Sequence, residues 1–247
     1  MHPIDRKYYI GINQKVNIQL LEDLLFSYWQ NGELNKEELA FGLQRSINGI
    51  NRRIKAQQTI QQIFKRQQYL LNFLRKKIRP QYFDYLAVSE KHAIILALLA
   101  LTYPIFYHTL CILAPVFKIQ PIVRRALVVD RLSALYGSNS TFFNALAAIF
   151  PMLQELGILQ KGNKPGLYQS CPPLFIKNPY IAQLIIYVEL KLCETSSITY
   201  EDIRKKYWFY FFDFSLPQRS DVGLYTIQPC LSAQLLFRPL PPSAIGS

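Results

Sequence analysis

Residues 121–169, PIVRRALVVDRLSALYGSNSTFFNALAAIFPMLQELGILQKGNKPGLYQ, alternate between helical and strand patterns. Val123, Leu127 and Leu132 recur at helical spacing, and residues 137–140, Gly-Ser-Asn-Ser, then break that helix and offer a cap for the next. Apolar residues line the second helix as far as Leu156, and we expect Pro151 to kink it. Two short strands, 157–160 and 167–169, flank a basic glycine turn at 161–166. The stretch predicts two helices and a hairpin within a mainly α fold.

The arrangement "LxELGIL…G…Y" after these helices resembles the recognition helix and small β-wing of winged-helix proteins. The resemblance covers about fifty residues and implies DNA contact. In that case Ser138, Asn139 and the site residues Ser140, Thr141 and Asn144 face the groove, with Lys161 and Lys164 beside a phosphate. The helix at 141–156 departs from a DNA reader because it contains no Lys or Arg and is apolar nearly all round. Packing or protein binding is therefore the alternative role of this module.

The order of parts along the chain resembles the BrxA family of BREX phage-defence accessory proteins. A basic N-terminal helical region and an apolar helical middle precede "ST…L…LxELGIL" and the wing. This resemblance implies a small, non-enzymatic, helical DNA-binding protein of a defence system.

Most of the positive charge lies in one segment. The chain carries a net charge of +12, and residues 45–79 contain ten Lys or Arg and no acid, whereas residues 1–44 carry a net −2. Ile47, Ile50, Ile54, Ile63 and Leu74 recur near helical spacing before Pro80, which predicts one long helix with an apolar face and a basic face. An acid-free basic face is typical of polyanion binding.

The residues before this helix predict a helix-turn-helix. Asn35 can cap a helix whose Leu39, Ala40 and Leu43 face inward, residues 44–46 make the turn, and Ser46 caps the next helix. An upstream helix over 16–29 completes the core through Leu20, Leu21, Leu24, Leu25 and Trp29. The predicted phosphate and base contacts are Arg45, Asn48, Asn51, Arg52, Arg53, Lys55, Lys65 and Arg66. Duplex DNA is the expected partner, with RNA as an open alternative.

Residues 92–117 contain no Asp, Glu, Lys or Arg and are long enough to cross a membrane. Pro104 divides the stretch into 89–102 and 104–114, each of ordinary globular length, so we predict two buried helices. A membrane anchor through 92–117 is the alternative. The predicted regions are a basic helix-turn-helix at 1–83, an apolar and winged-helix-like domain at 84–195, and an aromatic helix with a Pro-containing tail at 196–247.

Residues 180–193 fit either a helix or a strand. On a strand, Glu189-Leu190-Lys191 would match the E-x-K of metal-dependent nucleases, although no acid lies between Glu155 and Glu189. Thr199 is a candidate cap for an aromatic helix running through 204–212, where a basic triplet precedes six aromatic residues. From residue 215 onward the prolines predict an extended tail.

Enzyme signatures are absent from the sequence. Four dispersed cysteines and three histidines lack metal-ligand spacing, and no phosphate-loop, dinucleotide, nucleophile-elbow or zinc-protease motif occurs. We therefore expect no catalytic residue, cofactor or metal, and, since no secretory signal opens the chain, a cytoplasmic location. The expected function is non-enzymatic DNA binding as a regulator or assembly subunit, whose apolar modules hold a protein partner or a second copy. A structural subunit that binds an acidic partner is the alternative.

Overall fold

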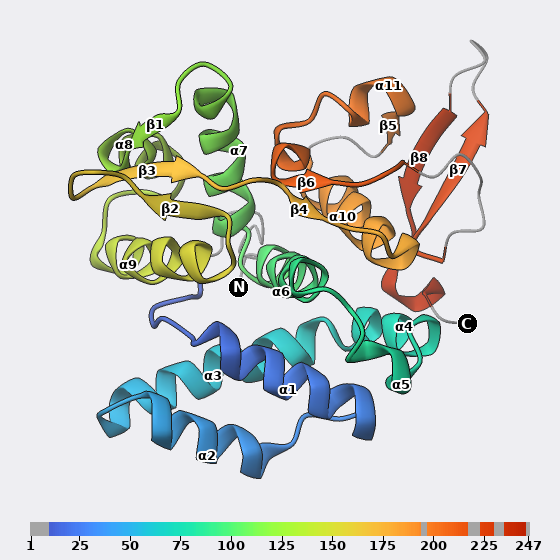
Figure 1. Cartoon of the computed structure of the whole chain (residues 1–247), viewed down its shortest axis with the longest axis horizontal. Helices are drawn as coiled ribbons and strands as arrows, with labels where there is room; N and C mark the ends of the chain where they lie inside the picture. The colour runs from blue at the N-terminus through green and yellow to red at the C-terminus, as the bar shows by residue number, and fades with distance from the viewer. Residues whose placement is uncertain (1–9, 194–196, 217–222, 230–234, 246–247) are drawn as a thin grey trace, which may run out of the picture.

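The computed structural model describes residues 10–193, 197–216, 223–229 and 235–245, and most of them are helical (Figure 1). This confirms the mainly α prediction. The helices are α1 (Ile18–Asn31), α2 (Lys36–Ser46), α3 (Ile50–Arg66), α4 (Gln68–Lys77), α5 (Pro80–Phe83), α6 (Val88–Thr102), α7 (Ile105–Phe117), α8 (Arg125–Tyr136), α9 (Ser140–Glu155), α10 (Pro179–Leu192) and α11 (Tyr200–Ile203). The strands are β1 (Ile122–Arg124), β2 (Leu159–Lys161), β3 (Leu167–Ser170), β4 (Leu174–Phe175), β5 (Ile198–Thr199), β6 (Phe212–Asp213), β7 (Tyr225–Pro229) and β8 (Leu235–Pro239).

Helices α1, α2 and α3 form the N-terminal unit (Figure 1). The predicted apolar residues of α1 are all buried, as are Leu39 and Leu43 of α2, whereas Ala40 is exposed, contrary to expectation. Asn35 caps α2 as predicted, because its side chain accepts hydrogen bonds from the backbone N–H of Glu37 and Glu38, both at 3.1 Å. The cap and most of the core positions of these two helices were therefore predicted correctly, and Ala40 was not.

The basic segment differs from its prediction. It forms two helices, α3 and α4, because the chain leaves helical geometry at Gln67, a buried residue whose side-chain amide donates to Thr102 Oγ1 at 3.2 Å. Ser46 ends α2 and does not cap α3, since its hydroxyl donates back to the carbonyl of Gly42. The start of α3 extends past the core, so Ile50 and Ile54, predicted to be inward, are 68% and 45% exposed.

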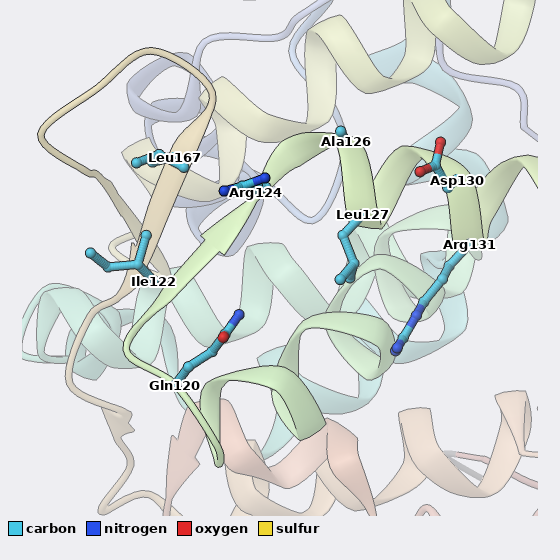
Figure 2. A pocket seen from close by; sticks show the side chains of 8 residues that line it. All are labelled: Gln120, Ile122, Arg124, Ala126, Leu127, Asp130, Arg131 and Leu167. Atoms are coloured by element: carbon cyan, nitrogen blue, oxygen red, sulfur yellow. The ribbon is translucent and has the colours of Figure 1, made fainter.

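A small antiparallel sheet with the order β1-β3-β2 lies beside α8 and α9. The predicted strands and turn at 157–169 are confirmed as β2, β3 and their connection, and Asn139 caps α9 by accepting from Phe142 N–H at 3.0 Å. Strand β1 pairs with β3 and leads directly into α8, as Figure 2 shows. No sequence pattern predicted β1.

The last quarter of the chain corrects two predictions. Residues 179–192 form helix α10, with Asn178 as its cap, so Glu189 and Lys191 do not lie on a strand and the nuclease pattern does not hold. Thr199 caps α11 as predicted, but α11 ends at Ile203, and a 3-10 helix at Tyr207–Phe211 replaces the expected long aromatic helix. The residues of the predicted tail that the structure describes include β7 and β8, which pair with each other, and β8 also pairs with β5. Pro217 lies outside the described residues.

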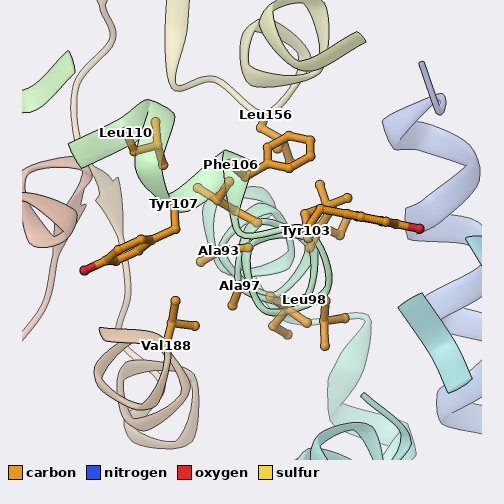
Figure 3. Packing of buried hydrophobic residues seen from close by; sticks show 14 of the residues in the cluster. Ala93, Ala97, Leu98, Tyr103, Phe106, Tyr107, Leu110, Leu156 and Val188 are labelled. Carbon is orange, nitrogen blue, oxygen red and sulfur yellow. The ribbon is translucent and has the colours of Figure 1, made fainter. Parts of the chain in front are cut away.

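Helix α6 lies at the centre of the core. Residues 93–100 are all buried, and in Figure 3 Ala93 and Ala97 of α6 lie near Phe106 and Tyr107 of α7 and Val188 of α10. The stretch divides into α6 and α7 at Pro104, as the sequence predicted, and the two helices meet at a bend of 113°. Within the described residues no single helix passes the length and hydropathy test for a membrane span, although this bent pair passes it jointly.

Candidate nucleic-acid interface

Helix α3 presents one polar stripe to solvent. Its core face is formed by Ala56, Thr59, Ile60, Ile63 and Phe64, which are all buried. At 3.6 residues per turn, the opposite side carries Asn51, Lys55, Gln58, Gln62 and Lys65, of which only Gln62 is partly covered. We call these five residues the α3 outer face. It extends for about 21 Å, since each residue adds about 1.5 Å along the axis.

The charged residues near this face have no acidic neighbours. Arg45, Arg52, Lys55 and Lys65 are exposed, Arg53 is half-buried, and none of these five forms an ion pair with an acid among the described residues. The two acids of α2, Glu37 and Glu38, lie in its first turn, at the opposite end of that helix from Arg45. The connection between α2 and α3 therefore bears unneutralised positive charge.

The predicted contact residues of this region fall at the two ends of α3. Asn48, in the loop that joins α2 to α3, is exposed close to Asn51 and Arg52, while the Arg45 guanidinium lies 5.5 Å from the centre of the Phe41 ring. Lys65 and Arg66 end the helix, and Arg66 Nη1 donates to the carbonyl of Thr102 at 3.4 Å. The α3 outer face joins these two groups, and its glutamines were not among the predicted contacts.

The second group of predicted contacts lies on α9 and the β2–β3 hairpin, apart from α3 in Figure 1. Ser140, Thr141 and Asn144 are exposed at the start of α9, together with Phe143, which is 49% exposed. Lys161, at the end of β2, and Lys164, in the turn, are also exposed. Arg124 on β1 and Arg131 on α8 are also exposed and positively charged, and neither was among the predicted contacts.

One arginine of the basic segment is structural. Arg75 Nε donates to the carbonyl of Trp29 at 2.7 Å, and its Nη2 donates to the carbonyl of Gln30 at 3.1 Å. These carbonyls belong to the last turn of α1, where no intrahelical donor reaches them. Because 46 residues separate Arg75 from Trp29, no local sequence pattern indicates this contact.

His92, His108 and the buried Glu189 form internal hydrogen bonds. His92 Nε2 lies 2.8 Å from a carboxylate oxygen of Glu22, and His108 Nδ1 lies 2.6 Å from the Tyr136 hydroxyl. Glu189 is 1% exposed and accepts from the Tyr107 hydroxyl at 3.0 Å. Burial raises the pKa of Glu189 to about 7 and outweighs the lowering effects of that hydrogen bond and of Lys206. Among the described residues no three His, Cys, Asp or Glu side chains are grouped to hold a metal ion.

Comparison with known proteins yielded no match to any protein-family model, curated protein or solved structure.

Proposed function

We propose that this protein binds duplex DNA through the α3 outer face and the basic residues at the two ends of α3. The observation that carries the proposal is the exposure of Arg45, Arg52, Lys55 and Lys65 without an acidic partner among the described residues. Folded proteins rarely concentrate one sign of charge unless an opposite charge binds there. The protein then acts without catalysis, as a regulator or as a subunit of a nucleic-acid-handling or defence assembly.

The chemistry of the α3 outer face suits DNA. Lysine and arginine neutralise phosphates, whereas asparagine and glutamine hydrogen-bond to base edges, above all to adenine. Asn51, Gln58 and Gln62 occupy the side of α3 between its two lysines, so a helix placed in the major groove directs amides at bases while Lys55 and Lys65 reach phosphates.

The α7–β3 region supports a second point of contact. Its elements follow the order helix, strand, helix, helix and hairpin, and β1 pairs with β3 in the order β1-β3-β2, which is the order expected of a winged-helix module. In that arrangement α9 faces the groove with Ser140, Thr141 and Asn144, and the hairpin brings Lys161 and Lys164 toward the backbone. Because α9 contains no Lys or Arg, we assign most of the affinity for DNA to α3.

The test is a salt titration of binding to a labelled random-sequence duplex. If about six phosphates are neutralised, the logarithm of the affinity falls with the logarithm of salt concentration with a slope of about −5. Replacing both lysines of the α3 outer face, Lys55→Ala and Lys65→Ala, is expected to weaken binding by roughly tenfold or more and to reduce the slope by about 2.

A matched control removes the same charge elsewhere. Lys177 and Lys205 are exposed, Lys177 just before α10 and Lys205 just after α11. Both helices lie away from α3 in Figure 1, so Lys177→Ala with Lys205→Ala should leave affinity nearly unchanged. Equal losses in the two double variants would refute the assignment to α3. Absence of binding at low salt by folded protein would refute DNA binding, and a parallel titration with duplex RNA decides between the two nucleic acids.

Exposed apolar side chains favour an acidic protein partner as the second candidate. Phe41 is 60% exposed and Ile50 68% exposed, and both lie near the basic α2–α3 connection. Phosphates offer such side chains no favourable contact, whereas an amphipathic acidic helix does. Under this candidate, unrelated duplex DNA would fail to bind and Ile50→Ser would weaken partner binding at constant charge.

A further inference from the structure

Strand β1 has one unpaired edge. On its paired side the Arg125 N–H donates to the carbonyl of Gly166 at 2.7 Å, and Val123 lies opposite Tyr168. Because bonded and non-bonded pairs alternate along an antiparallel ladder, Ile122 and Arg124 direct their backbone groups away from β3. No other described strand lies on that side.

Three backbone groups are available on this edge. The carbonyl of Arg124 begins the hydrogen-bonding of α8, as is usual for a residue that precedes a helix. The N–H and carbonyl of Ile122 and the N–H of Arg124 have no partner among the described residues. They form the donor and acceptor pattern to which an added strand binds.

The edge borders a groove of about 730 Å³. Ile122, Leu127 and Leu167 supply apolar surface, and Gln120, just before β1, and Arg131, on α8, supply polar groups. In Figure 2 the side chains of Gln120, Leu127 and Arg131 point into the space beside β1. An extended chain that pairs with β1 would therefore have side-chain contacts as well as backbone hydrogen bonds.

The charge of the groove favours an acidic occupant. Arg124 and Arg131 line it, and both are exposed. The one lining acid is Asp130, whose carboxylate points away from Gln120 and Arg131 in Figure 2. A guanidinium binds a carboxylate through two parallel hydrogen bonds, which makes arginine well suited to acidic side chains.

We propose that this groove binds an extended acidic segment of a protein partner, which adds a strand to β1 and places its carboxylates on Arg124 and Arg131. A peptide fits these groups better than DNA does. The unpaired carbonyl of Ile122 requires a donor, which a phosphate lacks, and Leu127 and Ile122 offer apolar surface that a sugar–phosphate backbone does not use. The proposal is independent of DNA binding by α3.

The test measures the binding of a fluorescein-labelled six-residue peptide of alternating glutamate and valine. Its fluorescence anisotropy is recorded at physiological salt as the protein is added. We expect saturable binding below roughly 1 mM protein, the weak end of specific association. Arg124→Glu with Arg131→Glu should weaken binding at least about tenfold, whereas the matched reversal Lys177→Glu with Lys205→Glu should change it by less than about twofold.

A second peptide separates strand addition from simple charge attraction. Methylating the alternate backbone nitrogens that would face β1 keeps every charge, removes the donor to the Ile122 carbonyl and places methyl groups between the two strands, so this peptide should not bind. Equal binding of the methylated peptide would overturn the proposal, as would the absence of binding by the first peptide to folded protein. The same conclusion would follow if duplex DNA displaced the peptide and Arg124→Glu with Arg131→Glu abolished DNA binding, because the groove would then be a phosphate site.

Discussion

Replacing Glu189 with glutamine should remove a pH dependence of stability. Glu189 is buried on α10 against the Tyr107 hydroxyl, and Lys206 is the other titratable group that shifts its pKa. Desolvation disfavours its charged form, so its pKa is about 7 in the folded protein and near the ordinary value of 4.5 in the unfolded chain. Glutamine keeps the acceptor for Tyr107 and cannot ionise.

The sign and size follow from these two pKa values. Between pH 4.5 and 7 the folded state holds a proton that the unfolded state has lost, so the free energy of unfolding falls as pH rises. The contribution is fully present below about pH 4.5 and is lost as pH rises through about 7. At about 1.4 kcal/mol per pH unit, its full size is about 3 kcal/mol.

Urea unfolding at pH 5, 6, 7 and 8.5 measures this contribution. The difference in unfolding free energy between Glu189→Gln and the unmodified protein should shift by up to about 3 kcal/mol in favour of the variant between pH 5 and pH 8.5. Tyr107→Phe removes a hydrogen bond that lowers the pKa and should move the transition to higher pH. Glu201→Gln, at an exposed position of α11, is the matched control. A difference that stays constant with pH would refute the reasoning.

Three further results are expected. Asn35→Ala removes the cap that serves two backbone N–H groups of α2 and should lower the free energy of unfolding in urea by about 1 kcal/mol. Asn48→Ala is the control and should leave the free energy of unfolding unchanged. Arg75→Ala leaves the carbonyls of Trp29 and Gln30 in the last turn of α1 without their donor and should lower the free energy of unfolding by about 2 kcal/mol. Lys65→Ala should leave the free energy of unfolding nearly unchanged, and an equal loss in both variants would contradict a structural role of Arg75. Burial raises the pKa of the Cys111 thiol to about 12, so peptide mapping should find it unmodified by iodoacetamide at pH 8 until the protein is unfolded, and rapid labelling would contradict this burial.

Signals that act within a few residues predicted structure well. Asn35 and Thr199 each cap a helix as predicted, and the cap of α9, Asn139, lies within the predicted region 137–140, because a cap and the groups that it serves lie within three residues. Pro104 divided α6 from α7 for an equally local reason, since proline lacks the N–H that would continue the α6 hydrogen bonds and its ring crowds the preceding turn. These positions required no knowledge of the tertiary structure.

Features set by distant contacts escaped prediction. Ile50 and Ile54 continue the apolar spacing of α3, yet both are exposed, because the core ends before it reaches them. The glutamine at position 67 interrupts the basic helix through its contact with Thr102, and β1 is a strand only because β3 pairs with it. Among the candidate contact residues, the exposure of the α3 lysines could be predicted from the charge composition of the segment. The position of the arginines beside β1 could not be predicted, because it depends on the pairing of β1 with β3.

The break at Gln67 limits the number of base pairs that the basic segment can read. An unbroken helix over 45–79 would extend for about 50 Å, and a straight rod of that length leaves a groove that winds around the duplex. The α3 outer face covers about 21 Å, which corresponds to about six base pairs at 3.4 Å each. Under the proposed function, α3 alone would protect about half a turn of DNA in a footprinting experiment. A longer footprint would have to come from the α9 module or from a second copy of the protein.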